Sequence, residues 1–256
     1  MKTIAVTHTV SPHINECELT YMEREEIDYP NALKQHGAYS ETLRRCGAEV
    51  FNLEENTDHP DSIFVEDNAV VVDEIAVITH MGAESRRAEV DTMADYLAQY
   101  REVVRIEAPA TIEGGDVMRV GKKVFVGLST RTNQAGVDAL RDKLAPYGYT
   151  VTGVATPGCL HLKTGITVLN DETLIGNTGW VDMSAFKDFR VIAAAPDEPW
   201  AGNALRVNDK VIMHEGHVRA IEEAEKLGIS VERTNISEFM KAEAGLTCMS
   251  IVFQKK

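Results

Sequence analysis

The sequence predicts an α/β fold made of five similar units arranged around a shared axis. Three observations lead to this prediction. Pairs of short apolar runs joined by tight polar turns recur along the chain, and amphipathic helical patterns lie between the pairs. Polar side chains stand at the head of each pair at intervals of 42 to 48 residues. Fixed periods of about 20 to 50 residues are typical of repeat architectures.

Each pair of apolar runs has the pattern of a β-hairpin. A polar cluster precedes the first run, a turn containing Asn, Asp or Gly follows it, and the second run ends in another polar group. Such turns between apolar runs are strong hairpin signals. The four expected hairpins cover residues 65–80, 112–129, 161–177 and 201–216, with turns at Asp73-Glu74, Gly121-Lys122, Asn170-Asp171 and Asn208-Asp209.

Helices are expected between the hairpins, over residues 83–100, 132–148 and 217–228. The last of these shows apolar residues at helical spacing, and Gly228 is a suitable terminator. Each unit therefore has the order strand, strand, helix, strand. To complete a fifth unit, the strand that follows Cys248 must pair with the N-terminal segment KTIAVTH.

Five units around one axis would bring their leading polar residues together at the centre. Glu66 and Asp67, Glu113, His161 and Cys248 hold equivalent positions in four of the units. The alternative is an α/β sandwich in which these residues only face water. Their chemistry favours a central site, because carboxylate, imidazole and thiol groups are typical of reactive sites rather than of solvated strand ends.

Composition limits the functional classes. Apolar residues make up 44% of the 256 residues, as in ordinary globular proteins, and one domain over residues 1–256 is expected. The net charge of −14 disfavours nucleic-acid binding. No apolar run approaches the roughly 18 residues of a transmembrane helix, and the start lacks the pattern of a signal peptide, so a cytoplasmic protein without membrane contact is expected.

Four cysteines in a chain of 256 residues do not suggest a disulfide framework. None of them form a C-x-x-C pair, so a structural zinc site is not expected either. Cys17, Cys46 and Cys159 are expected to be lid or packing residues. The segment HEGH at 214–217 has histidines three residues apart, whereas the zincin pattern needs four, so a strand-to-helix corner is expected there. No metal and no cofactor are expected.

Six motifs of the chain resemble one known family. They are PDSIFVEDNAVV, EGGDV, STRTN, HLKT, EPWAGN and LTCMSI, and they follow one another between residues 60 and 252. Their order is similar to that in the dimethylarginine dimethylaminohydrolases of the pentein, or guanidine-modifying, superfamily. The resemblance implies a five-fold pseudosymmetric α/β propeller, in agreement with the spacing of the repeats.

The resemblance also implies catalytic roles. Cys248 matches the nucleophile of the family, and His161 matches the residue that protonates the leaving amine and activates water. Glu113, from EGGD, resembles the carboxylate that orients this histidine, and Gly114 and Gly115 would let the backbone approach closely. By itself Cys248 would more often be a buried free thiol, and only its register with the other leading residues makes a nucleophile the better interpretation.

Substrate contacts are implied in the same way. Asp61 and Asp67 match the positions that bind the guanidinium, with Glu66 beside them and pointing the opposite way if this segment is extended. Arg86 and Arg131 match the α-carboxylate clamp, for which arginine is well suited. For Arg86 a solvated helix face is the competing interpretation.

A lid is expected over residues 15–30, which are polar and rich in glutamate. In the family a main-chain carbonyl of the lid contacts the α-amine of the substrate. In this chain that carbonyl would fall at about Leu19.

The implied partner is a small guanidino amino acid. The implied reaction is hydrolysis of Nω-methylated L-arginine to L-citrulline and methylamine or dimethylamine, through a covalent S-alkylthiouronium on Cys248. Three alternatives stay open: an arginine deiminase on the same scaffold, a non-catalytic propeller like the ribosome-binding branch of the fold, and a cysteine peptidase. A monomer and a homodimer are both compatible with the sequence.

Overall fold

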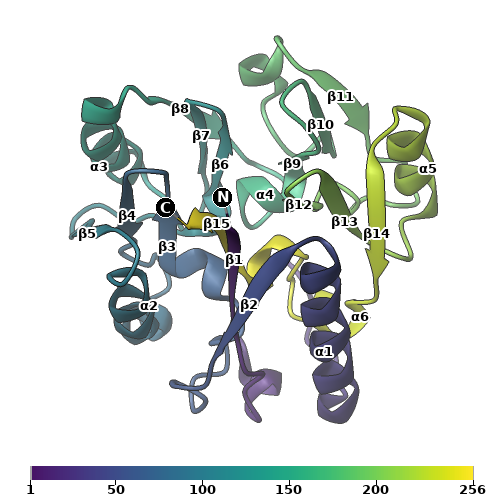
Figure 1. Ribbon diagram of the computed structural model, residues 1–256, viewed down its shortest axis with the longest axis horizontal. Coiled ribbons are helices and arrows are strands. Elements are labelled where there is room, and N and C mark those ends of the chain that lie inside the picture. The colour runs from purple at the N-terminus through teal and green to yellow at the C-terminus, as the bar shows by residue number, and fades with distance from the viewer. Residues whose placement is uncertain (1, 256) are drawn as a thin grey trace.

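The computed structural model describes residues 2–255 and contains five three-stranded sheets. In each sheet two strands pair antiparallel, and the middle strand also pairs parallel with a third strand, to which a helical segment connects it. Figure 1 shows the sheets arranged around a centre that the two chain termini approach. The predicted order of strand, strand, helix, strand is therefore confirmed, and the fold is a five-fold pseudosymmetric α/β propeller.

Four units follow one another along the chain, and each has a hairpin, a helical connection and a closing strand. The first contains β3 (Ala69–Val71), β4 (Ile75–Ile78), η3 (Glu84–Glu89), α2 (Val90–Leu97) and β5 (Glu102–Arg105). The second contains β6 (Val117–Val120), β7 (Lys123–Leu128), α3 (Gln134–Leu144), η5 (Ala145–Tyr147) and β8 (Thr150–Ala155). The third contains β9 (Ile166–Val168), β10 (Thr173–Gly176), η6 (Met183–Phe186) and β11 (Arg190–Ala193). The fourth contains β12 (Leu205–Val207), β13 (Lys210–His214), α5 (Val218–Lys226) and β14 (Ser230–Thr234).

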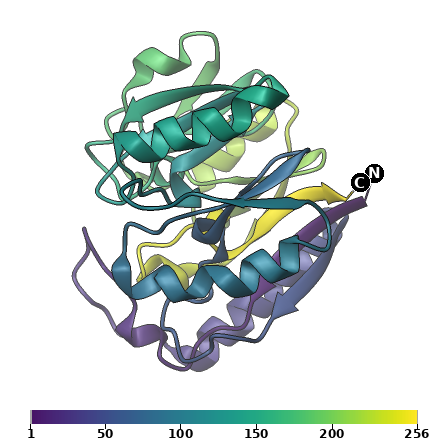
Figure 2. The same ribbon diagram turned by 90° about the vertical axis from the view of Figure 1, so that its left-hand side faces the viewer.

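The fifth unit joins the two ends of the chain. Strand β15 (Ile251–Lys255) pairs antiparallel with β1 (Lys2–His8), which in turn pairs parallel with β2 (Ala48–Leu53). Helix α1 (Tyr29–Arg45) connects β1 to β2 and packs near α6 (Ser237–Met240). Figure 2 shows the terminal strands side by side with both ends of the chain at one edge. The predicted closure by the C-terminal strand is thus confirmed.

All four hairpin turns lie where the sequence placed them. The helix expected over 217–228 is α5, and Gly228 follows it with φ of +76°, the left-handed conformation that glycine adopts without a steric penalty. The segment HEGH spans the end of β13 and the start of α5, as expected for a strand-to-helix corner. The helix expected over 83–100 is divided into η3 and α2.

A short helical turn stands before the first strand in four of the units. These turns are η2 (Val65–Asn68), η4 (Gly114–Asp116), α4 (Leu162–Gly165) and η7 (Thr247–Met249). Segments η2, η4 and η7 contact one another, and α4 contacts η4. Apolar clusters fill the space between the sheets and their outer helices, so each unit buries one face of its sheet. The helical turns are left at the centre, where they carry the polar residues.

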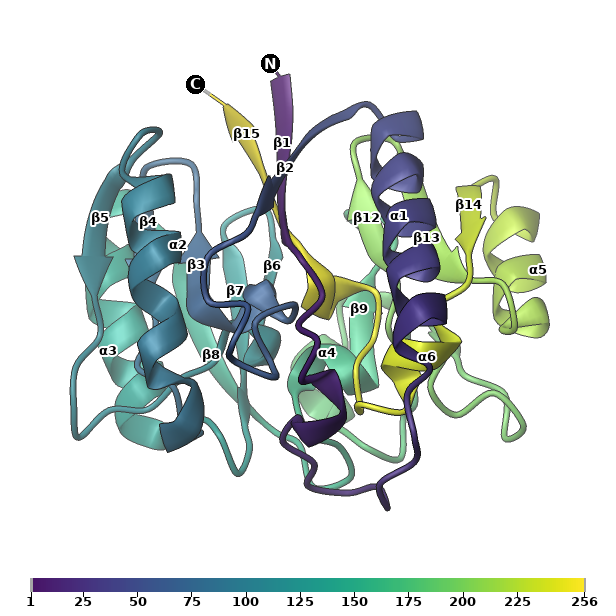
Figure 3. The same ribbon diagram turned by 90° about the horizontal axis from the view of Figure 1, so that it is seen from below.

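The predicted lid lies between β1 and α1 and contains the short helix η1 (Ile14–Glu16). Helix α1 already begins at Tyr29, with Asp28 as its N-cap, so the irregular segment is two residues shorter than the expected range 15–30. Figure 3 shows this segment at the end of the molecule opposite the two termini. No helix among residues 2–255 is both long enough and apolar enough to cross a membrane.

Candidate active site

The three residues predicted to be catalytic and Asp67, predicted to bind the substrate, meet at the centre of the propeller. Asp67 lies in η2, Cys248 in η7, and Glu113 and His161 are the residues that precede η4 and α4. Together they line one small cavity of about 30 Å³. The other residues around it are Glu18, Asp61, Phe64, Arg86, Arg131, Leu160, Ala242, Glu243 and Ala244. Residues at equivalent positions in the repeated units are therefore neighbours in space, as predicted.

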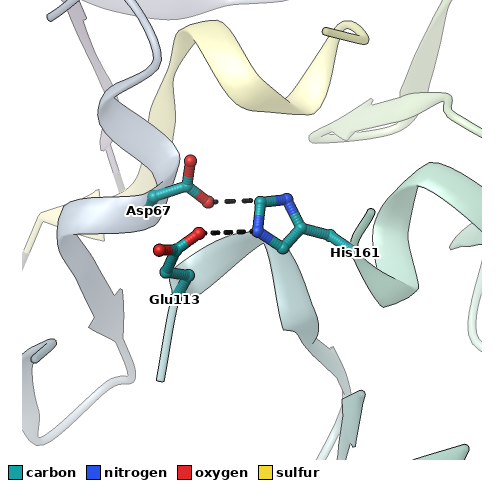
Figure 4. Close-up of side chains that lie close together, drawn as sticks. All are labelled: Asp67, Glu113 and His161. Atoms are coloured by element: carbon teal, nitrogen blue, oxygen red, sulfur yellow. Dashed lines mark hydrogen bonds and ion pairs between the residues drawn. The ribbon is translucent and has the colours of Figure 1, made fainter. Parts of the chain in front are cut away.

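His161 is held between two carboxylates. Its Nε2 lies 2.8 Å from Glu113 Oε2, and its Nδ1 lies 3.9 Å from Asp67 Oδ1. Figure 4 shows the imidazole ring facing both acids. All three residues are buried, and Glu113 is fully inaccessible. The second oxygen of Glu113 accepts the backbone N–H of Ala83 at 3.0 Å, which fixes the carboxylate for its bond to the ring.

This pairing shifts the pKa values of both partners. Burial alone would lower the pKa of His161, but the charge of Asp67, the hydrogen bond to Glu113 and the charge of Asp116 outweigh it and raise the pKa to about 9. Burial opposes ionisation of Glu113 too, and its hydrogen bond and charge interaction with His161 overcome this and lower its pKa to about 2. At neutral pH the pair is therefore an imidazolium next to a carboxylate.

Glycines allow the close approach of the segments around His161. A Cβ atom on Gly115 would lie 2.6 Å from His161 Nδ1, and one on Gly114 would lie 1.9 Å from the carbonyl oxygen of Glu66. Such distances are too short for any other residue. The close backbone approach expected from the two glycines of EGGD is thus confirmed.

Asp67 lies between His161 and Arg86. Its Oδ1 accepts the backbone N–H of Gly115 at 2.9 Å, and its Oδ2 is 2.7 Å from Arg86 Nη1. The other end of the Arg86 guanidinium is 2.9 Å from Glu89 Oε2. Arg86 is only 5% exposed, so the solvated helix face considered for it is wrong. Its guanidinium lines the cavity but is engaged by protein acceptors, so a role in binding the α-carboxylate requires one of these to be exchanged for a substrate oxygen.

Glu66 points away from Asp67, although the segment forms a 3-10 turn rather than the extended strand that was considered. Its Oε1 is 2.5 Å from Lys163 Nζ, and its Oε2 accepts the hydroxyl of Thr247 at 2.7 Å. Glu66 does not line the small cavity but lines a larger one on the other side of these contacts. The substrate contact predicted for Glu66 stays a prediction.

The Cys248 thiol is half-buried at the cavity and accepts a hydrogen bond from the backbone N–H of Gly245 at 3.3 Å. Burial raises its pKa, and the charges of Glu66 and Asp67 add to this, giving a value of about 12. The thiol is therefore protonated at neutral pH in the free protein. The other three cysteines are buried, as expected for packing residues.

Two carboxylates hold the lid over the cavity. Both oxygens of Asp61 accept the backbone N–H of Glu18, at 3.3 and 3.2 Å. Glu243 accepts the backbone N–H groups of Thr20, Tyr21 and Met22. Burial raises the pKa of Asp61 to about 6, against the opposing charge of Arg86. The lid thus rests on acids that also line the cavity.

Arg131 reaches the cavity from the segment before α3. Its Nη1 lies 3.8 Å from Glu113 Oε1, and its Nη2 donates to the Thr20 hydroxyl of the lid at 3.2 Å. These contacts do not use all five N–H donors of the guanidinium, so donors remain for a further acceptor. Leu19 is half-buried in the lid beside Thr20. The roles predicted for Arg131 and Leu19 stay predictions.

Asp67, Glu113 and His161 also place three potential metal-ligand atoms within 4.8 Å of one another. Each of these groups already has a partner in the chain, because Arg86 binds Asp67 and the imidazole binds Glu113. Arg86 and Arg131 add positive charge at the same place. The three groups therefore fit a proton-transfer site better than a metal site.

Sequence reasoning missed two buried acids that support the site. Asp116 accepts the backbone N–H of Leu162 at 2.9 Å and the hydroxyl of Ser129 at 2.6 Å, and so fixes the turn that carries His161. It belongs to the EGGD motif, which could have identified it. Glu243 gave no such signal, since it lies in an ordinary polar segment and acts on lid residues that are distant in sequence.

Comparisons with known proteins agree with this geometry. The family model "N,N dimethylarginine dimethylhydrolase, eukaryotic" matches residues 4–172. A dimethylarginine dimethylaminohydrolase of Pseudomonas aeruginosa is 37% identical over 228 residues, covering 88% of this chain and 90% of that protein. One of Streptomyces coelicolor is 36% identical and covers 96% of this chain and 95% of that protein.

Solved structures show the same likeness. The Pseudomonas aeruginosa enzyme, as a cysteine-to-serine variant in complex with citrulline, superimposes with a TM-score of 0.95 at 34% identity, over 99% of this chain and 100% of the other. An arginine dihydrolase from cyanobacteria shares the fold, with a TM-score of 0.85 at 18% identity, over 100% of this chain and 98% of the other. By sequence, by fold and by the register of its central residues, this chain belongs to the dimethylarginine dimethylaminohydrolase family of hydrolases.

Proposed function

We propose that the protein hydrolyses the guanidino C–N bond of Nω-methylated L-arginine, giving L-citrulline and dimethylamine or methylamine. The observation that carries this proposal is the single cavity in which Cys248, the His161–Glu113 pair and Asp67 meet. The curated relatives that are 36% and 37% identical bear the name of this activity, which supports it for this chain.

The charges around the cavity suit a cationic substrate. Five carboxylates line it, against two arginines and one histidine; the acids are Glu18, Asp61, Asp67, Glu113 and Glu243. A guanidinium leaves water only at a high cost unless carboxylates pair with it. Asp61 and Asp67 are the proposed partners of the guanidinium, and Arg131 and Arg86 those of the α-carboxylate. The carbonyl of Leu19 is the proposed acceptor for the α-amine.

The bound substrate helps to activate its own nucleophile. A pKa of about 12 leaves about one Cys248 thiol in 10⁵ ionised at pH 7. Part of this shift comes from the charges of Glu66 and Asp67, which the guanidinium would offset. A cation about 4 Å away is worth roughly 1–4 kcal/mol, or up to about three pKa units. The thiol proton leaves to solvent, because His161 is already an imidazolium.

In the first half-reaction the Cys248 sulfur forms a bond to the guanidinium carbon. Thiolate and cation together give a neutral tetrahedral adduct. His161 then donates its proton to the substituted nitrogen, the C–N bond breaks, and the neutral amine leaves. The product on the protein is a cationic S-alkylthiouronium, and His161 is now neutral next to Glu113.

In the second half-reaction neutral His161 accepts a proton from water as the oxygen attacks the thiouronium carbon. The C–S bond then breaks, and the hydroxyl proton of the adduct returns to sulfur or to solvent, which releases the ureido group of citrulline. A raised pKa of His161 suits the first step, in which it is an acid. Glu113 keeps the ring oriented through both steps.

We also propose a reducing, cytoplasmic location, which the four free thiols support.

The proposal is tested by incubating the purified protein separately with asymmetric dimethylarginine, monomethylarginine, arginine and agmatine. Citrulline and the released amine are both quantified. Equimolar citrulline and methylated amine from the methylated arginines, with little product from the other two, is the expected result. Ammonia from arginine as the main product would assign a deiminase reaction instead, and no product from any compound would contradict hydrolysis of guanidines by this site.

A further inference from the structure

A second cavity, of about 440 Å³, lies on the axis of the propeller and is separate from the catalytic one. The first strand of every unit contributes to its wall, namely β3, β6, β9, β12 and β15. Glu66, Lys163 and Thr247 line it as well, and their mutual contacts separate it from Cys248. Thr3 of β1 and Gln254 of β15 also line it. Figure 3 shows the free ends of these two strands opposite the lid segment.

The charged side chains of this cavity are mainly cationic, although the whole chain carries −14. Four cations face two carboxylates: the cations are Arg101, Arg119, Lys163 and Arg206, and the acids are Glu66 and Asp73. Each acid already has a partner. Lys163 binds Glu66, and Arg119 lies 3.3 Å from Asp73. Arg206 is paired outside the cavity wall with the exposed Asp171.

Arg101 is the cation that has no carboxylate partner among the described residues. Its Nε donates to the carbonyl of Val72 and its Nη2 to the carbonyl of Gln254, both at 2.6 Å. The guanidinium carbon lies 4.9 Å from the centre of the Phe253 ring. These contacts hold the planar group in one orientation and leave Nη1 buried, without a hydrogen-bond partner in residues 2–255. Arg101 as a whole is only 8% exposed.

A buried guanidinium nitrogen without an acceptor destabilises the fold, because it loses its hydrogen bonds to water and gains none within the protein. Burial lowers the pKa of Arg101, and the nearby charge of Arg119 adds to this, against the opposing charge of Asp73. An anion in the cavity would relieve both the missing hydrogen bond and the excess of positive charge. The volume is within the usual range of small-molecule sites.

We propose that this axial cavity binds a small oxyanion, a carboxylate or phosphate group, through the Arg101 guanidinium, whose buried Nη1 turns toward the cavity on binding, and through the positive charges of Arg119 and Arg206. The site is independent of the catalytic cavity, since Arg101, Arg119 and Arg206 do not line the latter. Carboxylate and phosphate oxygens share the acceptor chemistry that an arginine recognises.

Isothermal titration with inorganic phosphate and with citrate, at constant ionic strength, measures this binding. The expected result is one site per chain for at least one of the two, and the anion that binds identifies the chemistry.

Arg101→Gln should weaken that binding about tenfold or more. Arg206→Glu, which changes an exposed side chain at the cavity wall, should weaken it too and covers the case in which Arg101→Gln does not fold. Arg105→Gln is the matched control, because Arg105 is exposed, pairs with Asp91 and does not line the cavity.

The catalytic cavity also contains arginines, so Arg131→Gln distinguishes the two sites. Anion binding that persists in Arg131→Gln and weakens in Arg101→Gln or Arg206→Glu supports the axial site. Binding that is lost in Arg131→Gln and kept in the other two would place the anion in the catalytic cavity and overturn the proposal. No binding of either anion by the unmodified protein up to about 10 mM, ten times the Kd of about 1 mM of a weak complex, would overturn it as well.

Discussion

The Nε2 atom of His161 and the Oε2 atom of Glu113 lie 2.8 Å apart in a fully buried pair, although 48 residues separate them in the chain. The pair is formed because each residue immediately precedes the short helical turn at the head of its unit. Repetition of the unit places the two turns in contact. An acid–base pair at the centre of the molecule is thus a direct consequence of the repeat.

Replacement of Glu113 by Gln should slow turnover by about 10² to 10⁴, the usual range for general acid–base catalysis. The amide keeps the size of the side chain but removes a charge that raises the pKa of His161, so the pKa should fall toward its ordinary value of about 6.5. Single-turnover rates and the pKa of His161 by NMR measure both effects. Glu107→Gln is a control on an exposed residue just upstream. A near-native rate would show that another group orients His161.

The pH dependence of kcat/KM should follow the fraction of the free protein in which Cys248 is a thiolate and His161 is an imidazolium. Because the pKa of Cys248 is about 12 and that of His161 about 9, the form with thiolate and imidazolium increases about tenfold per pH unit from pH 7 to pH 9 and is constant above that. Below pH 6 the protonation of Asp61 should steepen the decline, since its pKa is about 6. A flat profile from pH 6.5 to 9 would mean that the free protein already holds a thiolate.

Arg131 should contribute through the α-carboxylate of the substrate. Arg131→Gln should raise KM for methylated arginine by about tenfold to a hundredfold, the effect of one charge-assisted hydrogen-bonded pair, with a smaller change in kcat. A methylated agmatine, which lacks the carboxylate, should be a poor substrate for the unmodified protein and no worse for Arg131→Gln. If the variant lost activity equally toward both compounds, Arg131 would act on the cavity itself rather than on the carboxylate.

Glu243 should act as the latch of the lid. Its carboxylate gathers three successive backbone N–H groups, those of Thr20, Tyr21 and Met22. Glu243→Gln weakens these bonds, because the amide offers a neutral oxygen in place of a charged one. Faster hydrogen exchange of these amides and a higher KM are expected, whereas Glu223→Gln, on the exposed side of α5, should change neither. Unchanged hydrogen exchange at residues 20–22 would show that Glu243 does not hold the lid.

The architecture could be predicted from sequence because its signals are local and repeated. The turns at Gly121-Lys122 and Asn208-Asp209 determine where hairpins form, and their regular spacing determines how the units stack. The central residues follow from the same register. This is why His161 and Cys248 could be assigned to one site before any contact was known.

The rest of the site depends on contacts that no periodicity encodes. Glu243 acts on the lid across more than 200 residues of sequence. The full engagement of the Arg86 guanidinium by Asp67 and Glu89 depends on side-chain packing around η3, where the sequence indicated a continuous helix. The same holds for Glu66, whose direction depends on a one-turn helix that a strand pattern did not predict.

The most direct test of the account compares the unmodified protein with Cys248→Ser in a time course of dimethylamine and citrulline release from asymmetric dimethylarginine. Circular dichroism establishes that both proteins are folded, and Cys46→Ser controls for the loss of a thiol elsewhere. Equimolar release by the unmodified protein and by Cys46→Ser, with no turnover by Cys248→Ser, is the predicted result. Release by Cys248→Ser at a rate near that of the unmodified protein would contradict covalent catalysis by this cysteine.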